Sequence, residues 1–274
     1  VNARLKPLEN LAQWRRDATT LHTWYYLYRV THWLPAPGLF AMARTMKSFS
    51  EVGIDAFFLS SAGVDRTRRN AATNDGDLAV AAYGNAPRNG YFTTPVSLEH
   101  VRAYIAVRLM WDADFDVAAG IREFCEVYYG PAVKQMVRYV TAVESSDSYD
   151  QTIESTMIDD PGVHSHYLWS ARMSSKAVEA LSALLVEALG EVADEPVHRR
   201  RVQMAQMTMD AAVLAYLPRD HMLWQGAFER FFALAEELQF RDLPTYFTPL
   251  HNRLKVSFPK YREFLLQKSS PKTE

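Results

Sequence analysis

Residues 21–61 read LHTWYYLYRVTHWLPAPGLFAMARTMKSFSEVGIDAFFLSS. The first part, residues 21–28, is an apolar and aromatic run, which is typical of a strand buried on both faces. A second apolar run, residues 54–59, lies between Gly53 and two serines and predicts another short strand. Between the two runs, apolar side chains three or four positions apart predict an amphipathic helix over residues 38–52; they are Leu39, Met42, Met46 and Phe49. This order predicts one βαβ unit with parallel strands.

The loop after the first predicted strand is the first place to look for function, because parallel α/β folds carry their chemistry at the carboxyl ends of strands. Aromatic rings stack on the apolar face of a pyranose, an arginine can bind a uronate carboxylate in a bidentate pair, and a histidine can bond a hydroxyl. The predicted substrate-binding residues are Trp24, Tyr26, Tyr28, Arg29, His32 and Trp33. The alternative is that the strand aromatics fill a core and that the charged side chains only support the loop.

Composition limits the classes of function. The chain has 274 residues, 48% of them hydrophobic, and a net charge of −2, so neither nucleic acid nor a membrane surface is favoured as a partner. No apolar run approaches the ~18 residues of a membrane-spanning helix. The single cysteine, Cys125, excludes an internal disulfide framework, and its place beside Phe124 on a predicted helix indicates a buried, inert thiol. A chain that begins at Val1 rather than at Met is expected to be processed or excerpted.

Three regions follow from the patterning. Residues 1–61 contain the βαβ unit and, before it, a predicted helix whose apolar face consists of Leu8, Leu11, Trp14 and Ala18. Residues 62–96 lack periodicity and are rich in Gly, Asn, Pro and Asp, so they are expected to be a long loop or insertion, either a solvated one or a substrate lid. Residues 97–274 are expected to be helical, beginning at Ser97 as N-cap. The apolar face of the first of these helices is predicted to consist of Val101, Tyr104, Ile105 and Leu109.

Several runs in the first half of the chain resemble one bacterial family, the domain-of-unknown-function 4838 family. They are LxPLENLAxWxxxAxxLxTWYY (5–26), THWLPAP (31–37), MKSFSEVGI (46–54), YIAVRLMWDADFD (104–116) and EFCEVYYGPA (123–132). This family is found in large proteins that are similar to α-glucuronidases and other glycoside hydrolases with a (β/α)8 barrel. The resemblance implies that residues 1–61 are the last βα units of a TIM-like barrel, an α/β fold followed by a mainly α-helical region.

Two positions depart from the pattern of that family. Tyr25 stands where the family carries an aspartate in the first strand, and Leu59 stands where the second strand often carries a glutamate. Glycosidases usually need two carboxylates around the scissile bond. Asp55 lies at the start of its strand, which is the wrong end for a barrel site. The catalytic residues are therefore left unassigned: the acids lie elsewhere in a longer protein, or the protein binds sugar without cutting it.

Other clusters have structural explanations. Asp112, Asp114, Asp116 and Glu123 have the spacing of a calcium loop, but Val117 stands where that loop needs glycine, so helix capping is the favoured interpretation. His164 and His166 have no further ligand beside them, and no phosphate-binding loop is present, so neither a metal nor a cofactor is predicted. The basic run from His198 to Arg201 is interpreted as a solvated face.

The sequence and the resemblance together favour a role in carbohydrate chemistry. The first hypothesis is the C-terminal portion of a glycoside hydrolase-like protein that acts on or binds glycans, uronic-acid-containing glycans among them. The expected partners are carbohydrate and the N-terminal barrel portion of the same protein, and the resemblance favours a periplasmic or extracellular location. The alternatives are a non-catalytic carbohydrate-binding module and a helical interaction or scaffold module.

Overall fold

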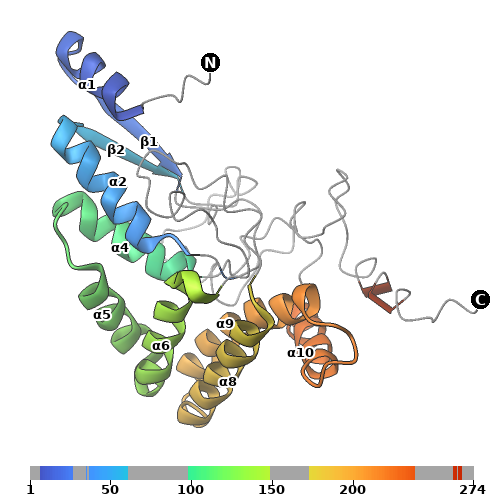
Figure 1. The fold of residues 1–274 in the computed structure, drawn as a ribbon. Helices are drawn as coiled ribbons and strands as arrows, with labels where there is room; N and C mark the ends of the chain where they lie inside the picture. The colour runs from blue at the N-terminus through green and yellow to red at the C-terminus, as the bar shows by residue number, and fades with distance from the viewer. Residues whose placement is uncertain are drawn as a thin grey trace, which may run out of the picture.

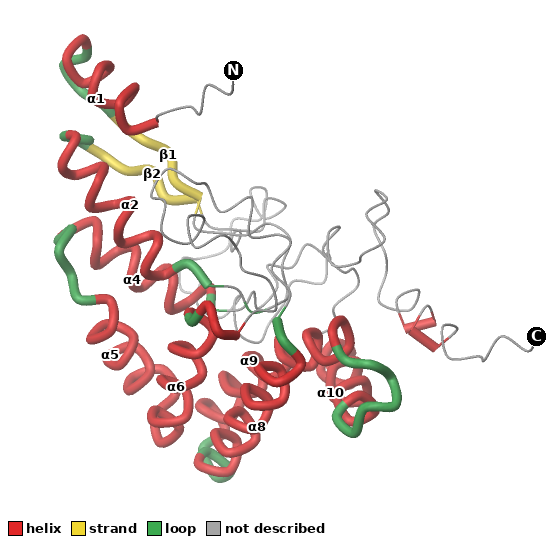
Figure 2. The backbone as a smooth tube through the Cα atoms, in the orientation of Figure 1, coloured by secondary structure: helices red, strands yellow, loops and turns green. Residues whose placement is uncertain are grey.

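The computed structural model describes residues 7–26, 35, 37–60, 98–148, 173–237, 262–263 and 265–266. Within these ranges the chain is mainly helical, and two short strands form a single sheet (Figure 2). The helices follow one another in a curved row that starts beside the strands, and each packs against the next (Figure 1). No helix in the described ranges is both long enough and apolar enough to cross a membrane.

The predicted βαβ unit is present. Its elements are β1 (His22–Tyr26), α2 (Leu39–Val52) and β2 (Ala56–Ser60), preceded by α1 (Pro7–Asp17). The strands are parallel, in a register that runs from His22 opposite Ala56 to Tyr26 opposite Ser60. The helix buries the predicted stripe of Leu39, Met42, Met46 and Phe49, and it ends at Gly53, whose φ of +84° suits glycine.

The amino end of the strand pair is fastened by one carboxylate. Asp55 accepts a hydrogen bond from the backbone N–H of Leu21 at 2.7 Å, and its other oxygen lies 3.6 Å from the Arg15 guanidinium. Arg15 in turn donates to the carbonyls of Ala18 and Thr19, both at 3.1 Å. Asp55 therefore ties the α1–β1 turn to β2.

The prediction of a TIM-like barrel is wrong. A (β/α)8 barrel needs eight parallel strands with a helix after each, whereas the described residues contain two strands, and α2 packs onto α4 rather than into an outer ring. Residues 1–61 are therefore not barrel units. A βαβ pattern reports only that two strands are parallel and carries no information on how many others join them. In this structure α2 is covered by helices, chiefly α4.

The main core lies between the helices that follow the βαβ unit. They are α4 (Glu99–Trp111), α5 (Val117–Tyr129), α6 (Val133–Glu144), α8 (Ser175–Glu191) and α9 (Pro196–Tyr216), with the 3-10 turns η2 (Gly130–Ala132) and η3 (Ser146–Ser148). Val101, Ile105 and Leu109 of α4 are buried as predicted. Ser97 lies outside the described residues; α4 begins one residue after Leu98, which has a φ of +62°.

Helix α9 is buried on two sides. Met209 and Val213 belong to the main core, whereas Met207, Ala211 and Leu214 belong to a second core under α10 (Trp224–Glu237). The second core is rich in aromatic rings; they are Trp224, Phe228, Phe231 and Phe232. A helix with apolar residues all round is one that other elements cover on both sides, and α9 accordingly joins the two cores into one body.

Candidate functional site

The carboxyl edge of the strand pair is where the sequence places the site. Trp24 and Tyr26 lie two positions apart on β1, so their Cα–Cβ bonds point to the same face of the sheet. The side chains of both residues lie outside the described part of the structure, as do the whole of Tyr28, Arg29, His32 and Trp33. Because the strands are parallel, β1 and β2 both end at this edge, at Tyr26 and Ser60.

The two positions that depart from the family pattern are direct neighbours. In the parallel register, Tyr25 of β1 lies opposite Leu59 of β2. Two carboxylates at these positions would lie side by side at the end of the sheet. Paired acid–base chemistry uses this kind of arrangement. This chain has a phenol and an aliphatic side chain in their place, so this edge of β1 and β2 lacks that pair.

The start of α2 is held by a carboxylate from a distant helix. Glu144, at the end of α6, accepts hydrogen bonds through Oε2 from the backbone N–H groups of Gly38 and Leu39, both at 2.8 Å. The first turn of α2 contains no acidic residue of its own. The exposed N–H groups of a helix start attract negative charge, and Glu144 supplies that charge from 106 residues away along the chain.

The segment that enters α2 is packed as well as hydrogen-bonded. Pro35 and Pro37 are both buried, and Leu39 is fully buried in the main core. Gly38 has a φ of +149°, a backbone conformation that side-chain-bearing residues rarely adopt. The prolines, the glycine and Glu144 together fix the point at which the THWLPAP segment joins the helix.

The acidic run at residues 112–116 caps helices, as the sequence predicts. Asp116 Oδ1 accepts hydrogen bonds from the backbone N–H groups of Ala118 and Ala119 at 2.9 and 3.1 Å, at the start of α5. Asp112 Oδ1 accepts one from the N–H of Asp114 at 2.9 Å. No cluster of three or more metal-ligating side chains occurs in the described ranges. His164 and His166 lie outside them.

Two glycines of the motifs permit close packing. A Cβ on Gly120 would stand 2.5 Å from the Phe115 ring and 2.7 Å from Ile105 Cδ1, so α4 and α5 approach each other at this point. Gly130 has a φ of +54°, and a Cβ there would stand 2.7 Å from the imidazole of His198 on α9. Phe115 of the DFD motif and Gly130 of the YYGPA motif therefore take part in the close packing of α4, α5 and α9.

The interpretation of the basic run at the start of α9 as a solvated face is wrong for most of its members. His198 covers Gly130. Arg201 donates to the backbone carbonyl of Tyr128 at 2.8 Å, and its guanidinium lies 4.4 Å from the centre of the Tyr128 ring. Arg200 pairs with Glu237 of α10 at 2.9 Å. Arg199 is exposed beside a shallow depression of about 370 Å³ that Asp194 and Glu237 also line.

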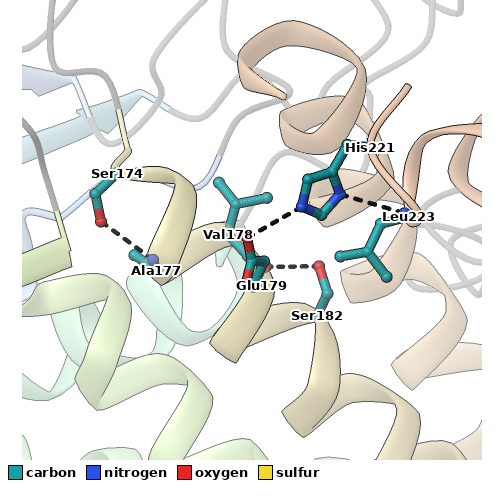
Figure 3. Close-up of polar contacts among 7 residues, drawn as sticks. All are labelled: Ser174, Ala177, Val178, Glu179, Ser182, His221 and Leu223. Atoms are coloured by element: carbon teal, nitrogen blue, oxygen red, sulfur yellow. Dashed lines mark hydrogen bonds and ion pairs between the residues drawn. The ribbon is translucent and has the colours of Figure 1, made fainter. Parts of the chain in front are cut away.

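A histidine–carboxylate pair, which the sequence did not reveal, links α8 to the turn before α10 (Figure 3). His221 Nε2 lies 3.0 Å from Glu179 Oε1, and His221 Nδ1 accepts the backbone N–H of Leu223 at 3.3 Å. In the neutral imidazole these contacts place the proton on Nε2. Ser182 lies one turn along α8, but its hydroxyl donates to the carbonyl of Val178 at 2.7 Å, so the group is a clamp and not a nucleophilic triad.

Burial shifts the pKa values of three groups, the buried Asp210 and Cys125 and the partly buried His100, far from their ordinary ranges. Burial raises the pKa of Asp210 to about 6, although the hydrogen bonds and charge of Arg230 act in the opposite direction. Burial, and to a smaller extent Arg201, lowers the pKa of His100 to about 4. Burial raises the pKa of Cys125 to about 12, and its side chain is fully buried, which agrees with an inert thiol. All three lie in the helical layer, away from β1 and β2.

Comparison with known proteins identifies the family. No curated protein and no solved structure matches the chain. The family model described as domain of unknown function (DUF4838) matches residues 2–141, which cover the βαβ unit, α4, α5 and most of α6. That match extends over half of the 274 residues, and the chain belongs to the DUF4838 family.

Proposed function

We propose that this chain binds glycans at the carboxyl edge of β1 and β2, with uronic-acid-containing glycans as the preferred class, and that it does so as part of a glycoside hydrolase-like protein. The binding residues are Trp24, Tyr26, Tyr28, Arg29, His32 and Trp33. One observation carries the proposal: these aromatic and cationic residues all lie within ten consecutive residues, Trp24 to Trp33, between the start of β1 and Gly38, where Glu144 holds the backbone.

The chemistry of that set suits an acidic sugar. Indole and phenol rings offer flat apolar faces for pyranose rings and polar tips for hydroxyls. The guanidinium of Arg29 can pair with a uronate carboxylate through two parallel hydrogen bonds, and the His32 imidazole can bond a hydroxyl. A neutral sugar lacks the group that Arg29 would bind, so a uronate is expected to bind more tightly than its neutral counterpart.

Binding without cleavage is the form of this function that the residues favour. Hydrolysis of a glycosidic bond generally needs two carboxylates on opposite sides of that bond. The family resemblance predicts carboxylates at two paired positions of the strands, and Tyr25 and Leu59 occupy those positions in this chain. Any acid that completes a catalytic pair would have to come from outside this strand pair.

A glycan array tests the proposal. We expect wild-type chain to bind arrayed oligosaccharides that carry glucuronic or galacturonic acid, with no release of sugar. We expect Trp33→Ala to lose about fivefold or more in affinity, if a sugar ring on an aromatic face contributes as much as a stacked base does, about 1–3 kcal/mol.

Trp111→Ala is the matched control. Trp111 is 89% exposed at the end of α4. The turn that follows it contains Asp114, which pairs with Lys47 in the second half of α2. Trp111 is therefore away from Gly38, which precedes the first turn of α2. This variant should bind as wild type does. Equal loss in both variants would reject the proposed location, and no binding by wild type would favour the helical interaction module instead.

A further inference from the structure

Helix α4 carries apolar side chains on the side that faces the core and also on the opposite side. Val101, Ile105 and Leu109 are buried in the main core. Val107 and Trp111, on the other side of the same helix, are 50% and 89% exposed. A helix that is apolar all round is normally covered on both sides, so the outer side of α4 is a candidate contact surface.

This surface continues onto α5, which packs beside α4 (Figure 1). Arg108 of α4 and Glu123 of α5 form a half-exposed ion pair across the two helices, with 3.7 Å between nitrogen and oxygen. Trp111 lies three positions after Arg108, and Val127, which is 76% exposed, lies four positions after Glu123. Residues three or four positions apart are neighbours on a helix surface, so the ion pair brings these side chains onto one face.

Aromatic packing connects the two helices along this face. The rings of Tyr104 and Phe124 are half-buried, and their centres lie 5.7 Å apart. Phe124 is next to Glu123 in the chain and one turn before Val127. We call this surface the α4–α5 face; its members are Val107, Arg108, Trp111, Glu123, Phe124 and Val127.

We propose that the α4–α5 face is the contact between two copies of this chain in a symmetric dimer. A two-fold axis places the same face on both sides of a contact, so that residue i of one copy meets residue j of the other and j meets i. An axis beside the Arg108–Glu123 pair brings each arginine next to the glutamate of the second copy. The face is therefore self-complementary in charge, and its apolar side chains cover those of the second copy.

The size and composition of the face suit a second copy. From the exposed fractions of its side chains, the face presents on the order of 600 Å², a large part of the 800 Å² or so that each partner contributes to a stable protein interface. Contiguous apolar surface of several hundred Å² on a soluble protein marks an interaction site, and tryptophan, phenylalanine and arginine are enriched in interfaces. The charges of Arg108 and Glu123 cancel, so two identical faces do not repel each other.

Sedimentation velocity of the whole chain tests the proposal. We expect wild type to dimerise with a dissociation constant of about 10 μM or lower. Val127→Glu should raise that constant at least about tenfold, because the new carboxylate would be buried in the contact without a partner. Val186→Glu is the matched control: Val186 is 61% exposed on α8, and the same substitution there should leave the dimer unchanged. Circular dichroism should show that both variants are folded.

Charge reversal tests whether the occupant is a second copy. Arg108→Glu and Glu123→Arg should each be monomeric at concentrations at which wild type is dimeric, since each places four like charges beside the axis. An equimolar mixture of the two variants should form a heterodimer, because an acidic face then meets a basic one. Neither substitution should unfold the chain, because an exposed ion pair contributes little to stability.

The dimer is independent of the proposed glycan site. Trp111→Ala should raise the dissociation constant of the dimer about tenfold, as expected for an exposed tryptophan anchor, and should keep the glycan affinity of each chain. A dimer adds avidity on an array. Trp111→Ala and Trp33→Ala are therefore also compared by titration in solution.

Four results would overturn the proposal. They are a wild-type chain that stays monomeric up to about 100 μM, a Val127→Glu variant that dimerises as wild type does, a Val186→Glu variant that dissociates as strongly as Val127→Glu, and a mixture of the charge-reversed variants that stays monomeric. A monomeric wild type would leave the α4–α5 face to a different protein. A wild-type dimer that both reversals dissociate and their mixture restores supports the proposal.

Discussion

Asp210 and His100 are expected to change the unfolding free energy of wild type little between pH 7.5 and pH 4.5, because their effects oppose each other. The folded-state pKa of Asp210 is raised from 3.8 to about 6, so the folded protein takes up a proton first and gains stability as pH falls through 6. The folded-state pKa of His100 is lowered from 6.5 to about 4, so the unfolded chain takes up a proton first and stability is lost as pH falls through 6.5.

Each effect is large when it stands alone. One pKa unit corresponds to about 1.4 kcal/mol, so at pH 4.5 the Asp210 gain and the His100 loss are each about 2–3 kcal/mol. Asp210 faces Arg230 of α10, and His100 of α4 lies beside Tyr128 of α5 and Arg201 of α9. The two contributions are of similar size and opposite sign, so they largely cancel in wild type.

Single variants should separate the contributions of Asp210 and His100 to the unfolding free energy, which have opposite signs. Asp210→Asn removes the gain, so urea unfolding should show a loss of roughly 2–3 kcal/mol between pH 7.5 and pH 4.5. His100→Gln removes the loss, so its stability should rise over the same range by about 2 kcal/mol. A double variant should be nearly flat, as wild type is. If the stability of both single variants changes with pH as that of wild type does, Asp210 and His100 do not make the two opposing contributions.

Gly130→Ala is expected to destabilise the fold by about 2–4 kcal/mol, from backbone strain and steric overlap together. Gly130 has a φ of +54° and a ψ of −124°, which an L side chain rarely adopts, and the new Cβ would meet the His198 ring at 2.7 Å. The α5–α6 turn and the start of α9 meet at this point. Thermal and urea unfolding of the variant measure the loss.

Two further variants separate the causes of that loss. Gly190→Ala, within α8, meets nothing within 4 Å and should stabilise by roughly 0.5–1 kcal/mol, because alanine is the better helix former. Replacing His198 by alanine in the Gly130→Ala background should recover the steric part and leave the backbone strain. An unchanged stability in Gly130→Ala would mean that the turn does not need glycine.

Local features of the fold could be predicted from the sequence where the cause is local. The stripe from Leu39 to Phe49, the end of α2 at Gly53 and the capping role of Asp116 all follow from spacing and from residue type. Trp14 shows where this reasoning fails, since helical spacing placed it on the apolar face of α1 but it is 59% exposed. Which face of a helix is covered depends on its neighbours, and spacing does not specify them.

Long-range features could not be predicted. The βαβ pattern was correct, but the barrel inferred from it and from the resemblance was wrong, because strand number is set by parts of the chain that the pattern does not contain. Glu144 reaches Gly38 across 106 residues, and Glu179 reaches His221 across 42, with no local signal for either contact. Arg201 belongs to a run that looked solvated until the fold placed Tyr128 beside it.

The location of the binding edge is tested most directly by hydrogen exchange followed by mass spectrometry on the whole chain, with and without a glucuronic-acid-substituted xylooligosaccharide. The account predicts that the ligand slows exchange in peptides covering residues 22–39 and leaves peptides from α8, α9 and α10, residues 175–237, unchanged. Slower exchange confined to the α8–α10 peptides, or to the end of α4 around Trp111, would contradict it.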